Sequence, residues 1–219
     1  IKKVIQMYKS HFSKFIRQNT GILHFAAHSH HYWPDVTLKA HEQYWLDSAK
    51  MVDGKWDYIL GDVIRKAQEN IASHCGFSNP EMIAFAPNTH EFVARLFSCF
   101  DPSKPFSVLT SDSEFHSFSR QISRLEENPS LEVVRIPAEP FEAFSVRLLA
   151  EIKNKTFDLV FISRVFFNSG FYIANIERII NAIQKNTIIV IDGYHAFFAI
   201  PQSVSSPSPG HSGPRSARA

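Results

Sequence analysis

Short apolar runs alternate with amphipathic stretches in the second half of the chain. The apolar runs are MIAFA, FSVLTS, LEVVRIP, DLVFIS and TIIVID. The stretches between most of them repeat at helical spacing: THEFVARLFSCF, HSFSRQISRLEEN, SVRLLAEIK and ANIERIINAIQKN. Strands without clean alternation, separated by amphipathic helices, are typical of a parallel sheet that is buried on both faces. The pattern therefore predicts an α/β fold with a mainly parallel sheet flanked by helices.

The first third of the chain predicts helices. DVTLKAHEQYWLDSAKMV follows Pro34, and ILGDVIRKAQENIASHCG ends at Gly76, a residue that suits the C-terminus of a helix. The opening IKKVIQMYKSHFSKFI has an amphipathic pattern with charges throughout, unlike a secretory signal. We therefore divide the chain into an N-terminal helical segment with an active-site loop, residues 1–80, and a larger α/β part, residues 81–202.

The composition changes abruptly after Gln202, where the chain continues as SVSSPSPGHSGPRSARA. A segment so rich in Ser, Pro and Gly cannot bury enough apolar surface to offset the entropy of ordering it. We expect residues 203–219 to be disordered, either as a tail that is not native to the protein or as a natural linker. Because the chain also begins with Ile, we expect it to be a partial, truncated one.

Composition and charge exclude several classes of function. The chain has 219 residues, of which 44% are hydrophobic, enough for one sizeable domain or a domain with an appendage. A formal charge of only +2 argues against nucleic acid as a partner. No apolar run approaches the roughly 20 residues that span a bilayer. Cys75 and Cys99 lack metal-ligand spacing, so we expect a cytoplasmic protein.

Polar residues follow the apolar runs, where a parallel sheet binds its ligands. Asn88, Thr89 and His90 open a helix, and the free N–H groups there suit a phosphate, although an ordinary helix cap explains them as well. After the next run come Phe115 and His116. Either ring can stack on a planar ligand, while a surface histidine at a helix start is the alternative.

The last apolar run ends in Asp192, and His195 follows closely. An aspartate at the end of a wholly apolar strand needs a cationic or hydrogen-bonding partner. A protonated ring nitrogen is such a partner, and the N–H groups of the following turn are another. The run before it is followed by Arg164 and, after two phenylalanines, by Asn168.

In their order along the chain, these segments resemble the class V aminotransferase group of fold-type I pyridoxal-phosphate (PLP) enzymes, which includes kynureninases and cysteine desulfurases. The resemblance runs from about residue 24 to residue 201. It implies that NTHEFVARL surrounds the PLP phosphate with Asn88, Thr89 and His90, and that His116 in EFHSF stacks over the pyridine ring.

The same resemblance implies that Asp192 in IDGYHA pairs with the pyridinium nitrogen and that His195 lies near the ring. An asparagine that many members carry before this strand falls at Phe167 in an ungapped match, and Asn168 replaces it after a shift of one residue. HFAAHSHHYWP resembles the N-terminal active-site loop. The residues of that loop which would face the substrate are His28, Ser29 and His30.

The chain departs from the family in one important respect. The Schiff-base lysine should follow the aspartate strand, yet no lysine occurs after Lys185, which precedes Asp192. We therefore expect no catalytic residue in this chain, weak or absent PLP binding, and no complete family reaction. The resemblance implies a homodimeric intact protein that acts on an amino acid or a related amine. Transaminase, lyase and hydrolase reactions all stay open.

Two other interpretations of the sequence remain. Four histidines close in sequence suggest a metal site, although no Cys or carboxylate cluster with structural-zinc spacing accompanies them, and we expect no metal. These histidines are His24, His28, His30 and His31. The missing lysine favours a different alternative, a non-catalytic α/β binding protein or a degenerate member of the family.

Overall fold

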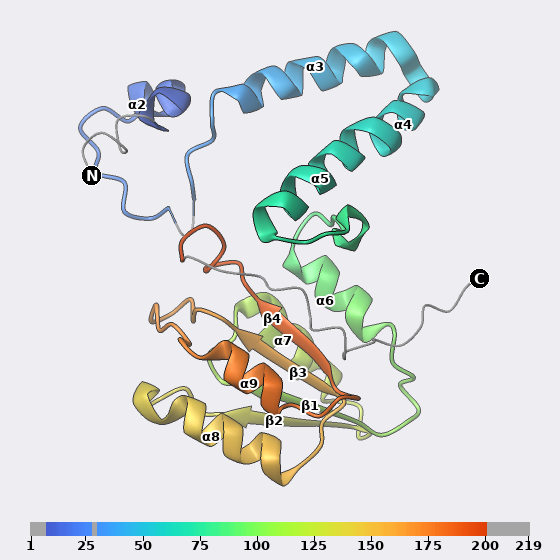
Figure 1. The fold of residues 1–219 in the computed structure, drawn as a ribbon, viewed down its shortest axis with the longest axis vertical. Coiled ribbons are helices and arrows are strands. Elements are labelled where there is room, and N and C mark those ends of the chain that lie inside the picture. The colour runs from blue at the N-terminus through green and yellow to red at the C-terminus, as the bar shows by residue number, and fades with distance from the viewer. Residues whose placement is uncertain (1–7, 28–29, 201–219) are drawn as a thin grey trace. The chain divides into compact units, whose positions relative to one another are not determined.

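The computed structural model describes residues 8–27 and 30–200. The chain divides into two compact units, residues 1–73 and residues 74–219, each of which is described by itself below (Figure 1). The division falls earlier than the boundary predicted at residue 80. The predicted tail, residues 203–219, lies outside the described residues. None of the described helices is long and apolar enough to cross a membrane.

The first unit is helical, as the sequence predicts. Its main helices are α2 (Ser13–Gln18), α3 (Val36–Met51), α4 (Lys55–Asp57) and α5 (Ile64–Cys75), with 3-10 turns at Ser10–Phe12 and Val52–Gly54 and a π-helical stretch at Tyr58–Val63. The Asp35 carboxylate accepts hydrogen bonds from the backbone N–H groups of Ser13 and Lys14, at 3.0 Å each. It therefore caps α2 from a distant part of the sequence. The last of these helices, α5, ends just inside the second unit, where Gly76 has the left-handed backbone that ends a helix, with φ +74°.

The second unit is an α/β fold. In chain order its elements are a 3-10 turn (Pro80–Met82), α6 (Thr89–Phe97), β1 (Phe106–Ser111), α7 (His116–Leu125), β2 (Leu131–Ile136), α8 (Phe141–Asn154), β3 (Leu159–Ser163), α9 (Ile176–Ala182) and β4 (Ile188–Asp192). The four strands are parallel, in the order β2-β1-β3-β4 (Figure 1). The predicted mainly parallel sheet is confirmed.

Helices cover both faces of this sheet, which explains why its strands do not alternate. All five residues of β3 are buried. On one face, Phe161 stacks on Phe118 of α7, with ring centroids 3.7 Å apart and planes 9° from parallel. On the other face, Ile162 packs in a cluster that includes Phe144 and Leu148 of α8. Burial of this kind contributes most of the stabilisation of an α/β core.

The strand order reverses between β1 and β3, and the ladder between these two strands is short. They pair only at Val108–Leu159 and Leu109–Val160. By contrast, β1 pairs with β2 as far as Ser111, and β3 pairs with β4 as far as Ser163 and Asp192. The carboxyl ends of β1 and β3 are therefore no longer joined by a backbone ladder. A reversal of this kind is where open α/β sheets form their ligand crevice.

One predicted strand is absent. MIAFA begins in a 3-10 turn that ends at Met82, and residues 83–86 form no strand with any part of the chain that the structure describes. A strand needs a hydrogen-bonded neighbour, and apolarity alone does not supply one. Met82 and Phe85 are accordingly 53% and 43% exposed. The prediction for this segment was wrong for that reason.

Candidate cofactor site

A cavity of about 380 Å³ lies along α6, beside β3 and the end of β4. Thr89, the first residue of α6, and Asp192, the last residue of β4, both line it. The rest of the lining is mostly apolar and comes from α6, β3, β4 and the residue after β4: Phe92, Val93, Leu96, Phe161, Val190, Ile191 and Gly193. Two of the residues predicted for the site thus share one cavity in the second unit.

The predicted phosphate residues stand at the N-terminus of α6. The Asn88 side chain accepts a hydrogen bond of 3.0 Å from the backbone N–H of Glu91 and so caps the helix. Thr89 is partly buried, whereas the His90 side chain is exposed. The backbone carbonyl of His90 accepts a 3.2 Å hydrogen bond from Gln121 of α7. Because Thr89 lines the cavity, the first turn of α6 presents the positive end of the helix dipole beside it.

Asp192 is only partly buried, although it ends a wholly apolar strand. Its Oδ1 accepts a hydrogen bond of 2.9 Å from the backbone N–H of Tyr194 and so caps the following turn. Its backbone carbonyl accepts one of 2.9 Å from the N–H of Arg164, just after β3. No hydrogen bond to Oδ2 comes from the residues that the structure describes. That oxygen leaves the carboxylate able to accept a donor from a ligand.

Four rings gather beyond the strand ends and form what we call the aromatic cluster: Phe115, His116, Phe167 and His195. Their closest ring contacts are edge-on, with centroids 4.8 Å apart for His116 and Phe167 and 5.2 Å apart for Phe115 and Phe167. Phe115 also meets His195 at 6.1 Å. The cluster therefore joins segments that follow β1, β3 and β4. Asn168, next to Phe167, is exposed and donates a 3.4 Å hydrogen bond to the Ser113 hydroxyl.

Glu114, which is only 3% exposed, is a residue of this edge that the sequence did not predict. Its carboxyl group accepts hydrogen bonds from the Ser111 hydroxyl at 2.5 Å and from the Ser163 hydroxyl and N–H at 2.5 and 2.9 Å. Burial, with a smaller contribution from the charge of Asp192, raises the pKa of this carboxyl group from 4.5 to about 7, against the lowering effect of these hydrogen bonds. The available signal was a glutamate between serines that end predicted strands.

Of the three residues predicted to face the substrate, only His30 is among the described residues, and it belongs to the first unit. His28 and Ser29 lie outside the described residues. The backbone N–H of His30 donates to the carbonyl of Ala26 at 2.9 Å, and its own carbonyl contacts the His24 ring nitrogen at 2.7 Å. Their role towards a substrate stays a prediction. Within residues 8–27 and 30–200, no group of three or more His, Cys, Asp or Glu side chains is arranged to hold a metal ion.

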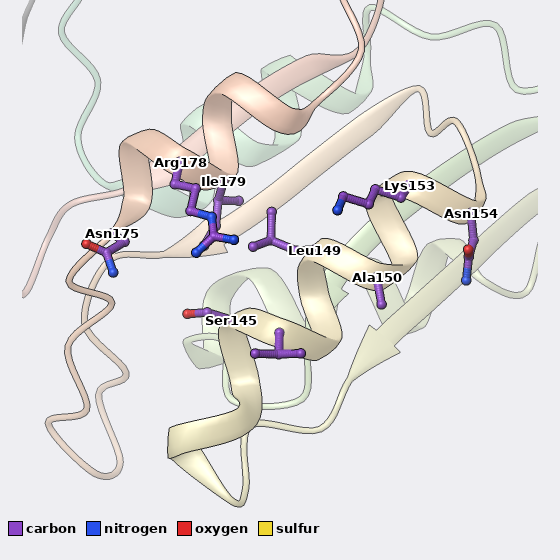
Figure 2. A pocket seen from close by; sticks show the side chains of 9 residues that line it. Ser145, Leu149, Ala150, Lys153, Asn154, Asn175, Arg178 and Ile179 are labelled. Atoms are coloured by element: carbon purple, nitrogen blue, oxygen red, sulfur yellow. The ribbon is translucent and has the colours of Figure 1, made fainter.

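A second cavity, of about 390 Å³, lies between α8 and α9 (Figure 2). Figure 2 shows Lys153 of α8 and Arg178 of α9 extending towards this space, with Leu149 and Ile179 between them. No strand end and no predicted site residue contributes to its lining. It is therefore separate from the cavity at Asp192.

The lysines of the second unit are at the opposite edge of the sheet. Each of them precedes a strand along the chain: Lys104, Lys153, Lys155 and Lys185. Lys185 lies in the turn between α9 and β4, not within the predicted helix, and its side chain is exposed. A parallel sheet puts such residues at its amino edge, away from Asp192. The carboxyl edge of the second unit thus carries a carboxylate, rings and a helix N-terminus without a lysine.

These features define an α/β protein with a cavity at the carboxyl edge of a parallel sheet. The chain belongs to the aminotransferase class-V family, whose sequence model matches residues 22–207. No curated protein sequence matches the chain significantly.

Several solved structures share the fold, among them two of C-DES. One is a complex of the cystine C-S lyase C-DES with its reaction product, cysteine persulfide, at 16% identity and a TM-score of 0.66, covering 80% of this chain and 48% of that one. The other is a lysine-to-alanine variant of C-DES with glycine covalently linked to the PLP cofactor, at 15% identity and a TM-score of 0.69, covering 83% and 49%. The present chain thus spans about half the length of these neighbours.

Proposed function

We propose that this chain forms the PLP-binding part of an enzyme that acts on an amino acid or a related amine. The observation that carries the proposal is the cavity that Thr89 and Asp192 line together, from the start of α6 and the end of β4. Membership of the aminotransferase class-V family supports it. So does the fold shared with C-DES, one structure of which contains a PLP cofactor.

The residues at this edge fit the chemistry of PLP. The first turn of α6 offers backbone N–H groups and a positive dipole end to a phosphate. The Asp192 carboxylate offers a negative charge to a protonated ring nitrogen, and opposite charges favour the charged forms of both groups. The rings of the aromatic cluster suit a flat heterocycle. A cavity of about 380 Å³ falls within the range of pockets that hold small ligands.

PLP, when bound, supplies an electron sink for a carbanion at the substrate α-carbon. Asp192 would keep the ring nitrogen protonated, and His116 would hold the plane of the ring. Asn88, Thr89 and His90 would surround the phosphate. Because the lysines of the second unit lie at the other edge of the sheet, its own contribution to PLP binding is non-covalent. That position also favours a second candidate function, a non-catalytic binding protein that retains the cofactor site.

PLP is expected to bind this chain at least about tenfold more tightly than pyridoxal, which has the same ring without the phosphate. The reason is that the helix N-terminus of α6 contacts a group that pyridoxal lacks. Titration followed by ligand absorbance measures both dissociation constants, with excess inorganic phosphate as competitor against PLP. Equal affinities, or PLP binding that phosphate does not reduce, would refute the assignment of α6 as the phosphate site.

A further inference from the structure

Glu114 occupies an unusual position for an acidic residue. It is 3% exposed, although glutamates are rarely buried without a partner of opposite charge. Among the described residues, the hydrogen bonds to its carboxyl group come from serines and a backbone N–H, and none comes from a cation. The cost of removing this group from water must therefore be met by these contacts or by protonation.

The contacts join two strands where their backbone ladder has ended. Ser111 is the last residue of β1 and Ser163 the last of β3, and the ladder between the strands stops at Leu109–Val160. One oxygen of Glu114 accepts from Ser111, and the other accepts from Ser163. The carboxyl group thus bridges the two strand ends at the reversal of strand order, where a crevice would otherwise open.

Through this bridge Glu114 is connected to Asp192 and His116, the two residues predicted to contact the PLP ring. Ser163 lies opposite Asp192 in the ladder of β3 and β4, and the next N–H along the chain, that of Arg164, donates to the Asp192 carbonyl. The backbone of Glu114 is held as well, because its carbonyl accepts a 2.9 Å hydrogen bond from Ser119 of α7. The residues directly after it are Phe115 and His116 of the aromatic cluster.

We propose that Glu114 is a positioning residue of the cofactor site, whose bridge between Ser111 and Ser163 fixes Asp192 on one side and the Phe115–His116 turn on the other. This inference rests on the proposed function. It assigns Glu114 no contact with the cofactor itself.

The charges around Glu114 are consistent with a carboxyl group that holds a proton near neutral pH. Asp192 faces it from β4, and its negative charge disfavours a second anion. Asp112 and His116 flank it along the chain, and Arg164 follows Ser163 but donates its side-chain hydrogen bond to Tyr172. A protonated Glu114 leaves Asp192 as the anion that faces a ring nitrogen. Glutamine is therefore a close mimic of its neutral form.

Two variants of the full 219-residue chain test the bridge, with Glu177→Gln, at an exposed position of α9, as the control. We expect Glu114→Ala to speed amide hydrogen exchange at Ser163 at least about tenfold, because that N–H loses its acceptor. The same variant should weaken PLP binding at least about tenfold.

Glu114→Gln should keep the exchange rate at Ser163 and the PLP affinity close to those of the wild type, since its amide accepts from Ser163 and donates to Ser111. The amide of Ile188, bonded at the opposite edge, should not change.

Unchanged exchange at Ser163 in Glu114→Ala would overturn the bridge. Faster exchange with unchanged PLP affinity would overturn the positioning role, because Glu114 would then stabilise the strand ends alone. If the wild-type chain binds no PLP, the proposed function fails, and the cofactor part of this inference fails with it, while the exchange rates still decide whether the bridge exists. If Glu114→Ala does not fold, Ser111→Ala removes the contact to β1 and should change both readouts in the same direction.

Discussion

Replacing Asp192 by alanine is expected to weaken PLP binding to this chain at least about tenfold. Asp192 is a partly covered carboxylate at the end of β4, and one of its oxygens already caps the turn at Tyr194. The other oxygen is the group proposed to meet a protonated ring nitrogen. A charge-assisted hydrogen bond of this kind is roughly twice as strong as a neutral one, so its loss should dominate the change in affinity.

Asp192→Asn separates the two roles of this side chain, because asparagine keeps an acceptor for the Tyr194 N–H but carries no charge. Dissociation constants are measured by PLP absorbance for the wild type and both variants. If the charge matters, both variants bind weakly. Affinity that is lost in Asp192→Ala but retained in Asp192→Asn would show that Asp192 caps the turn and does not pair with the ring.

Glu114→Gln is expected to remove a pH dependence of stability that amounts to about 3 kcal/mol in the wild type. The pKa of Glu114 is about 7 in the folded chain, against an ordinary value of 4.5. Between these values the folded state binds more protons than the unfolded state. The contribution of Glu114 to the free energy of unfolding of the wild type should therefore be greatest below pH 4.5. It should fall as the pH rises to about 7.

Urea unfolding of both proteins between pH 4.5 and 8 measures this difference, and only the difference between them is assigned to Glu114. Glutamine cannot ionise, so the variant should gain stability over the wild type as the pH rises. Glu177→Gln, an exposed change, should follow the wild-type curve. Parallel curves for Glu114→Gln and wild type would mean that Glu114 titrates at the same pH in the folded and unfolded states.

The apolar pattern predicted most of the second unit because burial on both faces of a parallel sheet requires it. FSVLTS, LEVVRIP, DLVFIS and TIIVID became β1 to β4, and the helices fall between them. MIAFA is also an apolar run but forms no strand, since pairing depends on a neighbour that no local pattern specifies.

The candidate site was only partly predictable for a related reason. Asn88, Thr89 and Asp192 were visible because each stands at the boundary of an element, where the sequence itself marks the position. Glu114 was not, because its burial arises only when folding brings Ser163 to it from 49 residues away. The degree to which Asp192 is covered likewise depends on packing around β4 and not on the apolarity of the strand itself.

The most direct test of the cofactor site is a map of amide chemical shifts in the 219-residue chain as PLP is added. We expect saturable changes at Thr89–Glu91, at Asp192–Gly193 and in the aromatic cluster, with much smaller changes between α8 and α9. Shifts confined to Lys153 and Arg178 in that second cavity, or no saturable shifts at all, would contradict the proposed cofactor site.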